Sequence, residues 1–203
     1  EDGALLVEGD RIRAVGSRAD VPVPAGTTRV DLGEVILLPG LVNPHCHLDY
    51  TAMATQVAPS ASFTDWIKSI TTLKGTWSSD EFRASWLAGA AMLLRRGVTT
   101  VGDIEAVPDL LPAVWEATPL RVLSFLEMTG VKSRRDPREI VEGAVSKLAA
   151  LPVGRCRVGL SPHAPYSTVP ALLRSSAEAA RTRGWLVTTH VAESAEEDEM
   201  FAH

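Results

Sequence analysis

The sequence predicts an α/β fold, a partial (β/α)8 TIM barrel of about five strands preceded by part of a small β-sandwich domain. Two observations lead to this prediction. Short apolar runs separated by turn residues fill the first 38 residues, and from residue 41 onward β-rich segments alternate with longer helical segments. Such alternation is typical of parallel βα units. Because a complete barrel needs about 250 residues, we expect its remaining strands beyond residue 203.

The small β domain is expected over residues 1–38, and the first part of the barrel over residues 39–203. In the small β domain, glycine, proline and aspartate separate short apolar runs, and these runs predict strands at 4–7, 11–15, 28–31 and 35–38. The chain begins directly before a strand and stops inside an expected helix. We therefore expect it to be a piece of a longer protein.

The expected barrel elements follow in regular order: strand 41–46, helix 80–96, strand 98–103, helix 109–117, strand 120–126, helix 137–150, strand 155–160, helix 170–183, strand 186–191 and helix 195–203. Three helix starts carry a capping-box pattern, namely Ser78 with Glu81, Asp136 with Glu139 and Ser194 with Glu197. Gly97 and Gly184 follow basic helix ends and indicate where two helices stop. Residues 50–77 are expected to be irregular, with one helical turn or more at 63–67.

The composition, with 45% hydrophobic and 22% charged residues, is ordinary for a soluble globular protein. The net charge of -5 comes from interspersed charges, which argues against a nucleic-acid partner or a membrane-binding patch. No apolar run approaches the roughly 20 residues of a membrane span. The two cysteines, Cys46 and Cys156, lack the dense pattern of a secreted disulfide scaffold. We therefore expect reduced thiols in the core and a cytoplasmic location.

A histidine pair ends the first barrel strand. His45 and His47 are two residues apart, so on an extended strand both imidazoles point to the same face. Neutral imidazoles suit Zn or Fe(II), although an isolated pair of this kind is a weak signal. His163 and His190 strengthen it, because each follows another expected strand, at the end where barrel enzymes assemble their sites.

Glu193 lies three residues after His190. A carboxylate at that place can take a proton from a metal-bound water and pass it to a leaving group. The alternative is that Glu193 only begins the acidic run 193–199, which is favourable at a helix N-terminus. Trp66, in the long segment after the first strand, either lines a substrate pocket or packs on the barrel.

Three segments in the same order resemble the amidohydrolase superfamily: residues 39–47 (PGLVNPHCH), 161–166 (SPHAPY) and 190–193 (HVAE). They are most similar to its deaminase and chlorohydrolase branch, which includes guanine deaminase, methylthioadenosine/S-adenosylhomocysteine deaminase and the triazine hydrolases. Residues 2–12 resemble the small β domain of that family, and residues 63–67 are faintly similar to aminodeoxyfutalosine deaminases.

The resemblance implies a role for each matching residue. His45, His47 and His190 would bind one divalent metal ion, with Zn expected first and Fe as the alternative. Glu193 would be the proton shuttle. His163 would face the substrate or polarise the attacked carbon, and Trp66 is assigned to substrate binding.

Two departures from the family pattern matter. The family's further histidine after the sixth strand and its aspartate after the eighth strand have no counterpart in this chain, and neither Asp49 nor Asp103 is a substitute. The expected fourth strand, 155–160, contains no lysine, whereas binuclear relatives bridge two metals with a carboxylated lysine there. This favours a mononuclear site and a deaminase over a cyclic-amide hydrolase.

The resemblance therefore implies a metal-dependent hydrolase, first of all a hydrolytic deaminase of an amino-substituted nitrogen heterocycle of purine or nucleoside type, using a metal-activated water. The alternatives are a chlorohydrolase or a cyclic-amide hydrolase of the same superfamily, or an inactive fragment that lacks the last metal-binding aspartate. The expected partner is a small-molecule substrate. The oligomeric state stays open, with a homo-oligomer as one alternative.

Overall fold

The computed structural model describes residues 2–152 and 154–202. The chain divides into two compact units, Glu1–Leu38 and Pro39–His203, and each is described by itself. Within the described residues, none of the helices combines the length and the apolar character that a membrane crossing requires.

The first unit contains an antiparallel hairpin of β1 (Gly3–Glu8) and β2 (Arg11–Ser17). Gly9 lies in the connecting turn with φ of +60°, which glycine adopts without steric cost. The predictions of strands at 28–31 and 35–38 are wrong. Side chains there are exposed, as Val30 (75%) and Ile36 (86%) illustrate, and neither segment pairs with a neighbouring strand. A strand without a ladder leaves its backbone groups to water.

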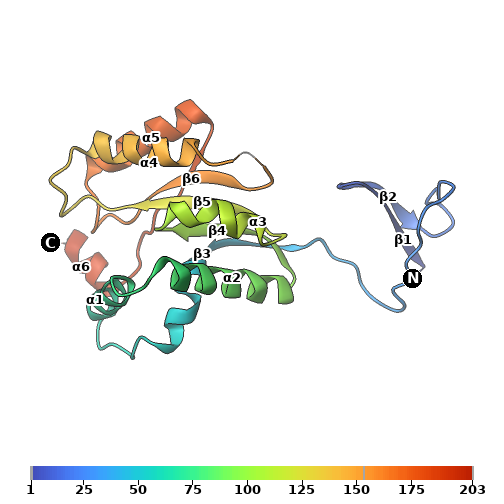
Figure 1. The fold of residues 1–203 in the computed structure, drawn as a ribbon, viewed down its shortest axis with the longest axis horizontal. Coiled ribbons are helices and arrows are strands. Elements are labelled where there is room, and N and C mark those ends of the chain that lie inside the picture. The colour runs from blue at the N-terminus through green and yellow to red at the C-terminus, as the bar shows by residue number, and fades with distance from the viewer. Residues whose placement is uncertain (1, 153, 203) are drawn as a thin grey trace. The chain divides into compact units, whose positions relative to one another are not determined.

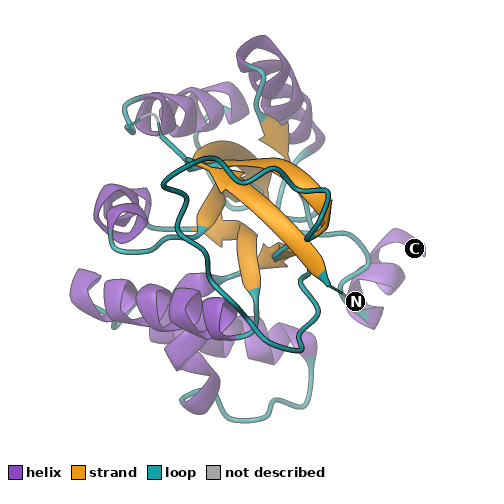
Figure 2. Cartoon of the chain, turned by 90° about the vertical axis from the view of Figure 1, so that its right-hand side faces the viewer, coloured by secondary structure: helices purple, strands orange, loops and turns teal. Residues whose placement is uncertain are grey.

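The second unit is built on a five-stranded parallel sheet in the order β3-β4-β5-β6-β7. The strands are β3 (Leu41–Cys46), β4 (Val98–Glu105), β5 (Arg121–Met128), β6 (Arg157–Pro162) and β7 (Leu186–Val187). The sheet is curled, with helices covering its outer side (Figures 1 and 2). This half barrel confirms the predicted fold class.

The helices of this unit are α1 (Phe63–Lys74), α2 (Ser79–Arg95), α3 (Leu111–Glu116), α4 (Pro137–Ala149), α5 (Pro170–Arg183) and α6 (Ala195–Ala202), with short 3-10 helices η1 (Leu48–Thr55) and η2 (Pro108–Leu110). Residues 50–77 are therefore less irregular than predicted. Ser62 caps α1 by accepting a hydrogen bond from the Asp65 N–H, and the helix continues for 12 residues. The last residue of the helix expected at 195–203 lies outside the described residues.

Helix termini follow the sequence signals in part. The capping box of Ser78 and Glu81 is present in full. Asp136 caps α4 through the N–H of Arg138, one residue earlier than the capping-box pattern requires. Gly184 ends α5 with φ of +65°, a left-handed conformation that glycine favours.

The core lies between the sheet and the helices. One cluster joins α2 and α3 to β4 and β5, and its buried members include Trp86, Val101, Leu111, Val122 and Cys156. A second cluster joins α4 and α5 to β5 and β6. Cys46 packs against the first cluster, so both thiols contribute to apolar packing.

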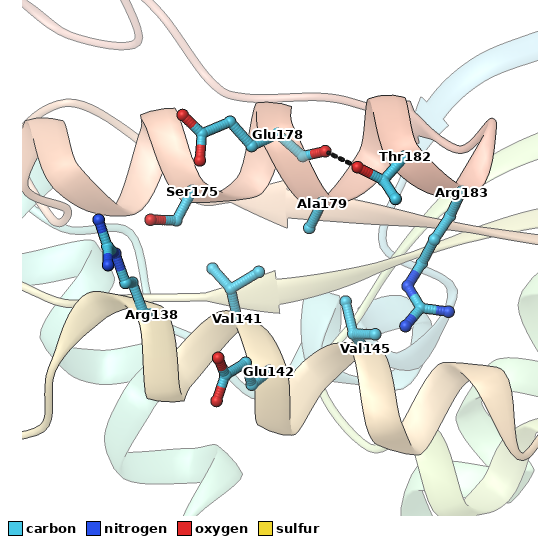
Figure 3. A pocket seen from close by; sticks show the side chains of 9 residues that line it. All are labelled: Arg138, Val141, Glu142, Val145, Ser175, Glu178, Ala179, Thr182 and Arg183. Atoms are coloured by element: carbon cyan, nitrogen blue, oxygen red, sulfur yellow. Dashed lines mark hydrogen bonds between the residues drawn. The ribbon is translucent and has the colours of Figure 1, made fainter.

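A groove runs between α4 and α5 in the helix layer. Figure 3 shows Val141 and Val145 of α4 beside Ala179 of α5, with Arg138 and Arg183 at its two ends. None of the residues that the sequence assigned to a functional site lines this groove. The candidate chemistry lies elsewhere, at the carboxyl ends of the strands.

The segment after β7 is only partly a strand. The predicted strand 186–191 is reduced to two residues, because the backbone leaves regular pairing after Val187. Hydrogen bonds along β6 nevertheless continue, from Thr188 N–H to Leu160 O at 3.0 Å and from His190 N–H to His163 O at 2.7 Å. This irregular continuation places His190 beside His163.

Candidate active site

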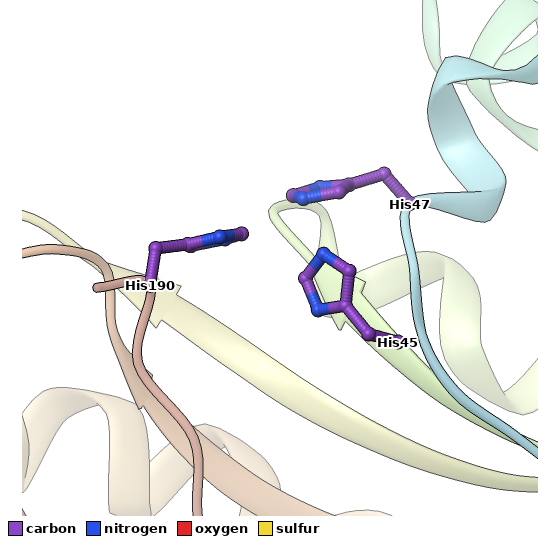
Figure 4. Close-up of side chains that lie close together, drawn as sticks. All are labelled: His45, His47 and His190. Atoms are coloured by element: carbon purple, nitrogen blue, oxygen red, sulfur yellow. The ribbon is translucent and has the colours of Figure 1, made fainter. Parts of the chain in front are cut away.

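Three histidines converge at the carboxyl ends of the strands (Figure 4). His45 lies in β3, His47 follows that strand directly, and His190 lies in the segment after β7. The ring centroid of His45 lies 4.8 Å from that of His190 and 5.3 Å from that of His47. Nitrogen atoms of the three imidazoles lie within 4.8 Å of one another. Segments more than 140 residues apart in sequence thus supply one cluster.

Strand β3 is held close to β4 below this cluster. A Cβ atom at Gly102 of β4 would lie 2.3 Å from the carbonyl oxygen of Pro44, so only glycine allows this approach without a backbone shift. Asp103, which is fully buried, accepts hydrogen bonds from the Leu48 N–H at 2.9 Å and the Trp86 Nε1–H at 2.8 Å. These contacts fix the backbone on both sides of His45 and His47. Asp103 thus joins β4 to the backbone after His47 and to the indole of Trp86.

Burial favours the neutral imidazole at two of the three histidines, His45 and His47. It lowers the pKa of His47 to about 3, with further lowering from His45 and His190. Burial also lowers the pKa of His45, assisted by His190. The Nε2 atom of His190 is buried and has no hydrogen-bond partner in the described part of the chain. Imidazole nitrogens are common zinc ligands, and the unpartnered buried Nε2 of His190 beside His45 and His47 fits such an ion.

Glu193 lies beside His190 and is oriented by two neighbours. Its Oε1 atom lies 3.4 Å from His190 Nδ1, and its Oε2 atom accepts a hydrogen bond from the Tyr166 hydroxyl at 2.8 Å. The preceding Ala192 has φ of +59°, a left-handed conformation that costs a non-glycine residue about 1–2 kcal/mol. The Glu193 N–H donates to the Glu197 carboxylate at 2.7 Å. This strained, tied turn presents the Glu193 side chain to the histidines.

The acidic run after Glu193 is not uniform. Glu197 is 4% exposed, whereas Glu196, Asp198 and Glu199 are exposed. The Ser194 hydroxyl accepts from the Glu197 N–H at 3.2 Å, which is half of the expected capping box. Because the Glu197 carboxylate binds the Glu193 N–H, it supports the turn before α6 rather than solvating the helix surface.

His163 lies directly after β6 and joins a second group. Its Nδ1 atom is 2.6 Å from Ser167 Oγ, and its Nε2 atom is 3.8 Å from Glu127 Oε1. Burial lowers its pKa, while Glu193 opposes this shift and Lys74 adds to it. Glu127, His163 and His190 also have ligand atoms within 4.8 Å of one another. His163 therefore adjoins the three-histidine cluster through His190, with ring centroids 5.0 Å apart.

Trp66 lies in α1 and is 37% exposed. Its ring stacks on Phe63 with centroids 5.7 Å apart, and Phe63 meets Tyr166 edge to face at 6.1 Å. The Phe63 ring therefore stands between Trp66 and the tyrosine that binds Glu193. The prediction that Trp66 contacts a substrate stays a prediction.

Sequence reasoning missed several polar residues near the cluster. Glu105 is the last residue of β4 and Glu127 the second-last residue of β5, and burial raises the pKa of each carboxyl group. Their signal was present, since both stand at the carboxyl end of a strand, but the expected strands stopped at residues 103 and 126. Tyr50 and Lys74 lie in the segment that was expected to be irregular, so nothing in the pattern brought them together.

Asp49 is buried at 1% exposure, and neither of its carboxylate oxygens has a hydrogen-bond partner among the described residues. The nearest cation is Lys74, whose Nζ lies 4.0 Å from Asp49 Oδ2. Burial raises the pKa of Asp49 well above its ordinary value, and Glu105 adds to this rise while Lys74 opposes it.

A half barrel with histidines and carboxylates at the carboxyl ends of its strands has the arrangement of a barrel enzyme. The sequence profile of the Amidohydrolase family matches residues 36–203, which is most of the chain. The chain therefore belongs to the amidohydrolase family. A profile described as the imidazolonepropionase-like composite domain of bacteria matches residues 3–22 in the first unit.

Among curated proteins, the chain is 28% identical to the 5-methylthioadenosine/S-adenosylhomocysteine deaminase of Symbiobacterium thermophilum, over 98% of this chain and 46% of that protein. It is 29% identical to the 5'-deoxyadenosine deaminase of Methanobrevibacter smithii, over 99% of this chain and 47% of that protein. The chain thus spans about half the length of the curated relatives it matches.

Among solved structures, the aminofutalosine deaminase of Helicobacter pylori in complex with methylthio-coformycin is 26% identical, with a TM-score of 0.64 over 79% of this chain and 39% of that chain. A zinc-bound adenosine deaminase from Xanthomonas campestris has a TM-score of 0.77 over 100% of this chain and 48% of that chain. Because the two sequences are only 24% identical, this likeness supports the fold and nothing beyond it.

Proposed function

We propose that this chain contributes the first part of the catalytic barrel of a metal-dependent hydrolytic deaminase, acting on an amino-substituted nitrogen heterocycle of purine or nucleoside type. The observation that carries this proposal is the convergence of three imidazoles, including the buried free Nε2 of His190, beside the carboxylate of Glu193. The deaminases among its relatives support the reaction class.

His45, His47 and His190 would hold one divalent ion, zinc in the first place and iron as the alternative. When bound, such an ion supplies Lewis acidity that lowers the pKa of a water molecule to about 7. The aspartate that completes the set in the family is not present in this chain.

Glu193 would move the proton. Its Oε1 atom, 3.4 Å from His190 Nδ1, is the atom placed to accept a proton from the attacking water and to return it to the leaving amino group. The Tyr166 hydroxyl holds the other oxygen, so the carboxylate keeps one orientation through both transfers.

His163 would contact the substrate. Its Nδ1 is tied to Ser167 Oγ at 2.6 Å, which fixes the ring plane and leaves Nε2 directed toward Glu127. A fixed, neutral imidazole can hydrogen-bond a ring nitrogen or polarise the attacked carbon. Phe63 and Trp66 would form an aromatic wall of the same site.

The test combines metal analysis with product detection on the complete gene product. We expect about one zinc or iron ion per chain, lost in His45→Gln and His190→Gln, and release of ammonia from aminopurines or their nucleosides. Chloride release without ammonia from a matched panel of chlorinated heterocycles would replace the deaminase by a chlorohydrolase. A metal-free complete gene product that releases neither would refute the enzyme proposal.

A cytoplasmic location completes the proposal. Cys46 and Cys156 are free, and Cys156 is buried in the core. Reduced thiols of this kind suit a reducing compartment. Cell fractionation followed by thiol labelling of the unfolded protein checks this expectation, because reactive thiols at Cys46 and Cys156 in the cytosolic fraction support it and a disulfide at either position contradicts it.

A further inference from the structure

Lys74 reaches the histidine cluster from the end of α1. Its side chain is 20% exposed, and its Nζ donates a hydrogen bond to the Tyr50 hydroxyl at 2.8 Å. The Tyr50 ring in turn stacks on the His47 imidazole, with centroids 4.6 Å apart and ring planes within 17°. A lysine 27 positions away from His47 is thus joined to that ring through one tyrosine.

The same ammonium group faces buried carboxylates. Its Nζ lies 4.0 Å from Asp49 Oδ2, and both Asp49 oxygens are buried without a hydrogen-bond partner among the described residues. The Oε2 atom of Glu105 is buried and unpartnered in the same way. A buried carboxylate strongly favours a nearby cation. This attraction draws the Lys74 side chain inward, so that it meets Tyr50.

We propose that Lys74 is a positioning residue for His47. It holds the Tyr50 ring against the imidazole and thereby fixes the plane of the His47 ring at the proposed metal site. The inference rests on the proposed metal site. Stacking covers one face of the His47 ring and leaves its edge, which carries the nitrogen atoms, free to face His45 and His190. Outer groups that orient a metal-binding histidine change metal affinity by about 10- to 100-fold.

Four variants, together with the double variant of Lys74→Met and Tyr50→Phe, separate this role from simple charge balance. Lys74→Met removes the ammonium group and keeps an apolar stem, and Tyr50→Phe keeps the stacked ring and removes only the hydroxyl. Asp49→Asn combined with Lys74→Met removes both buried charges. Lys68→Met is the matched control, since Lys68 lies in the same helix with a 71% exposed side chain that pairs with Asp65.

Zinc affinity is measured on the complete gene product by competition with a chromogenic chelator. We expect Lys74→Met to weaken zinc binding by about 10- to 100-fold, Tyr50→Phe to weaken it by a smaller factor, and Lys68→Met to leave it unchanged. Because Lys74 acts through Tyr50, the two substitutions together should weaken binding no more than Lys74→Met alone. Asp49→Asn should not restore affinity to Lys74→Met; full restoration would mean that Lys74 only balances the charge of Asp49, and the proposal would fall.

A second measurement does not depend on the metal. In the zinc-free protein, the imidazole proton resonances of His47, assigned with His47→Gln, should shift in Lys74→Met because the ring current of Tyr50 changes. The resonances of His163 should shift less. If the wild-type protein binds neither zinc nor iron, the proposed function fails, and the His47 resonances then decide the positioning role. Resonances that stay unchanged in a folded Lys74→Met protein, together with unchanged zinc affinity where zinc binds, overturn it.

Discussion

The hydroxyl of Tyr166 donates a hydrogen bond to Glu193 over 2.8 Å, while the other oxygen of that carboxylate lies 3.4 Å from His190 Nδ1. Burial raises the pKa of Tyr166, and the hydrogen bond to Glu193 raises it further. Tyr166 therefore remains a protonated donor at neutral and mildly alkaline pH. Tyr166 lies in the loop after β6, whereas Glu193 lies in the turn after β7. The hydrogen bond therefore joins two different loops of the half barrel.

Tyr166→Phe should lower kcat/KM by roughly 10- to 100-fold. A hydrogen bond to a charged group contributes about 1.5–3 kcal/mol, and each 1.4 kcal/mol corresponds to a factor of about 10 in rate. The zinc content should stay unchanged, because Tyr166 contacts no proposed ligand except through Glu193. Steady-state kinetics of the complete gene product with a responsive aminopurine substrate checks this. Wild-type kinetics in the variant would mean that Tyr166 does not orient the carboxylate.

Glu193→Gln should reduce kcat by about 100- to 10,000-fold, the range that general acid–base groups contribute. The substitution preserves size and hydrogen bonding but cannot carry the proton, so metal content and KM should change little. Glu199→Gln provides the matched control, because Glu199 is exposed in the adjoining helix α6. Equal losses in both variants would point to a general effect on α6, and no loss in either would remove Glu193 from the mechanism.

The half barrel could be predicted because its signals are local. Apolar strands alternate with capped helices. Helix α2 begins after Ser78 and helix α5 ends at Gly184, as these residues predict. One failure occurs where a partner decides the structure, because the segments 28–31 and 35–38 have strand-like composition but no ladder. The full length of α1 was missed for another reason: its apolar residues at 63, 66, 67, 70 and 73 have helical spacing, but the expected helical turn was followed only to residue 67.

The candidate site was predictable only for residues with a distinctive chemistry at a strand end. His45, His47 and His190 have this property, and the structure brings them together. Lys74 and Tyr50 lie in a helix and a 3-10 helix whose positions follow from tertiary packing. The hydrogen bond between them joins positions 24 residues apart, and no periodicity in the sequence encodes such a contact.

The stability conferred by His47 should depend on pH in a definite direction. Its folded pKa is about 3, lowered mainly by burial, against an ordinary value of 6.5. Below about pH 6.5 His47 is protonated in the unfolded chain but stays neutral in the folded chain. The contribution of neutral His47 is therefore present above that pH and is lost as the pH falls toward 3.

This prediction is checked on the zinc-free protein by comparing denaturant unfolding of the wild type and His47→Gln. The difference in unfolding free energy, wild type minus variant, should decrease from about pH 7.5 to about pH 5. The buried carboxyl groups of Asp49, Glu105 and Glu127 have raised pKa values and favour the folded state as the pH falls, but both proteins contain them. A difference that stays constant across this range would contradict the burial of a neutral His47.

Gly102→Ala should weaken both the fold and the metal site. The added Cβ would lie 2.3 Å from the Pro44 carbonyl oxygen, so β3 must move away from β4, and Pro44 directly precedes His45. Overpacking of this kind costs about 1–3 kcal/mol. Gly143→Ala in α4 is the matched control, since its Cβ would meet only Arg135 at 3.5 Å and alanine favours a helix. The free energy of unfolding, measured with denaturant, and the zinc affinity should both fall in Gly102→Ala, and neither should fall in Gly143→Ala. If Gly102→Ala loses stability but keeps its zinc affinity, the histidine geometry does not depend on the β3–β4 contact.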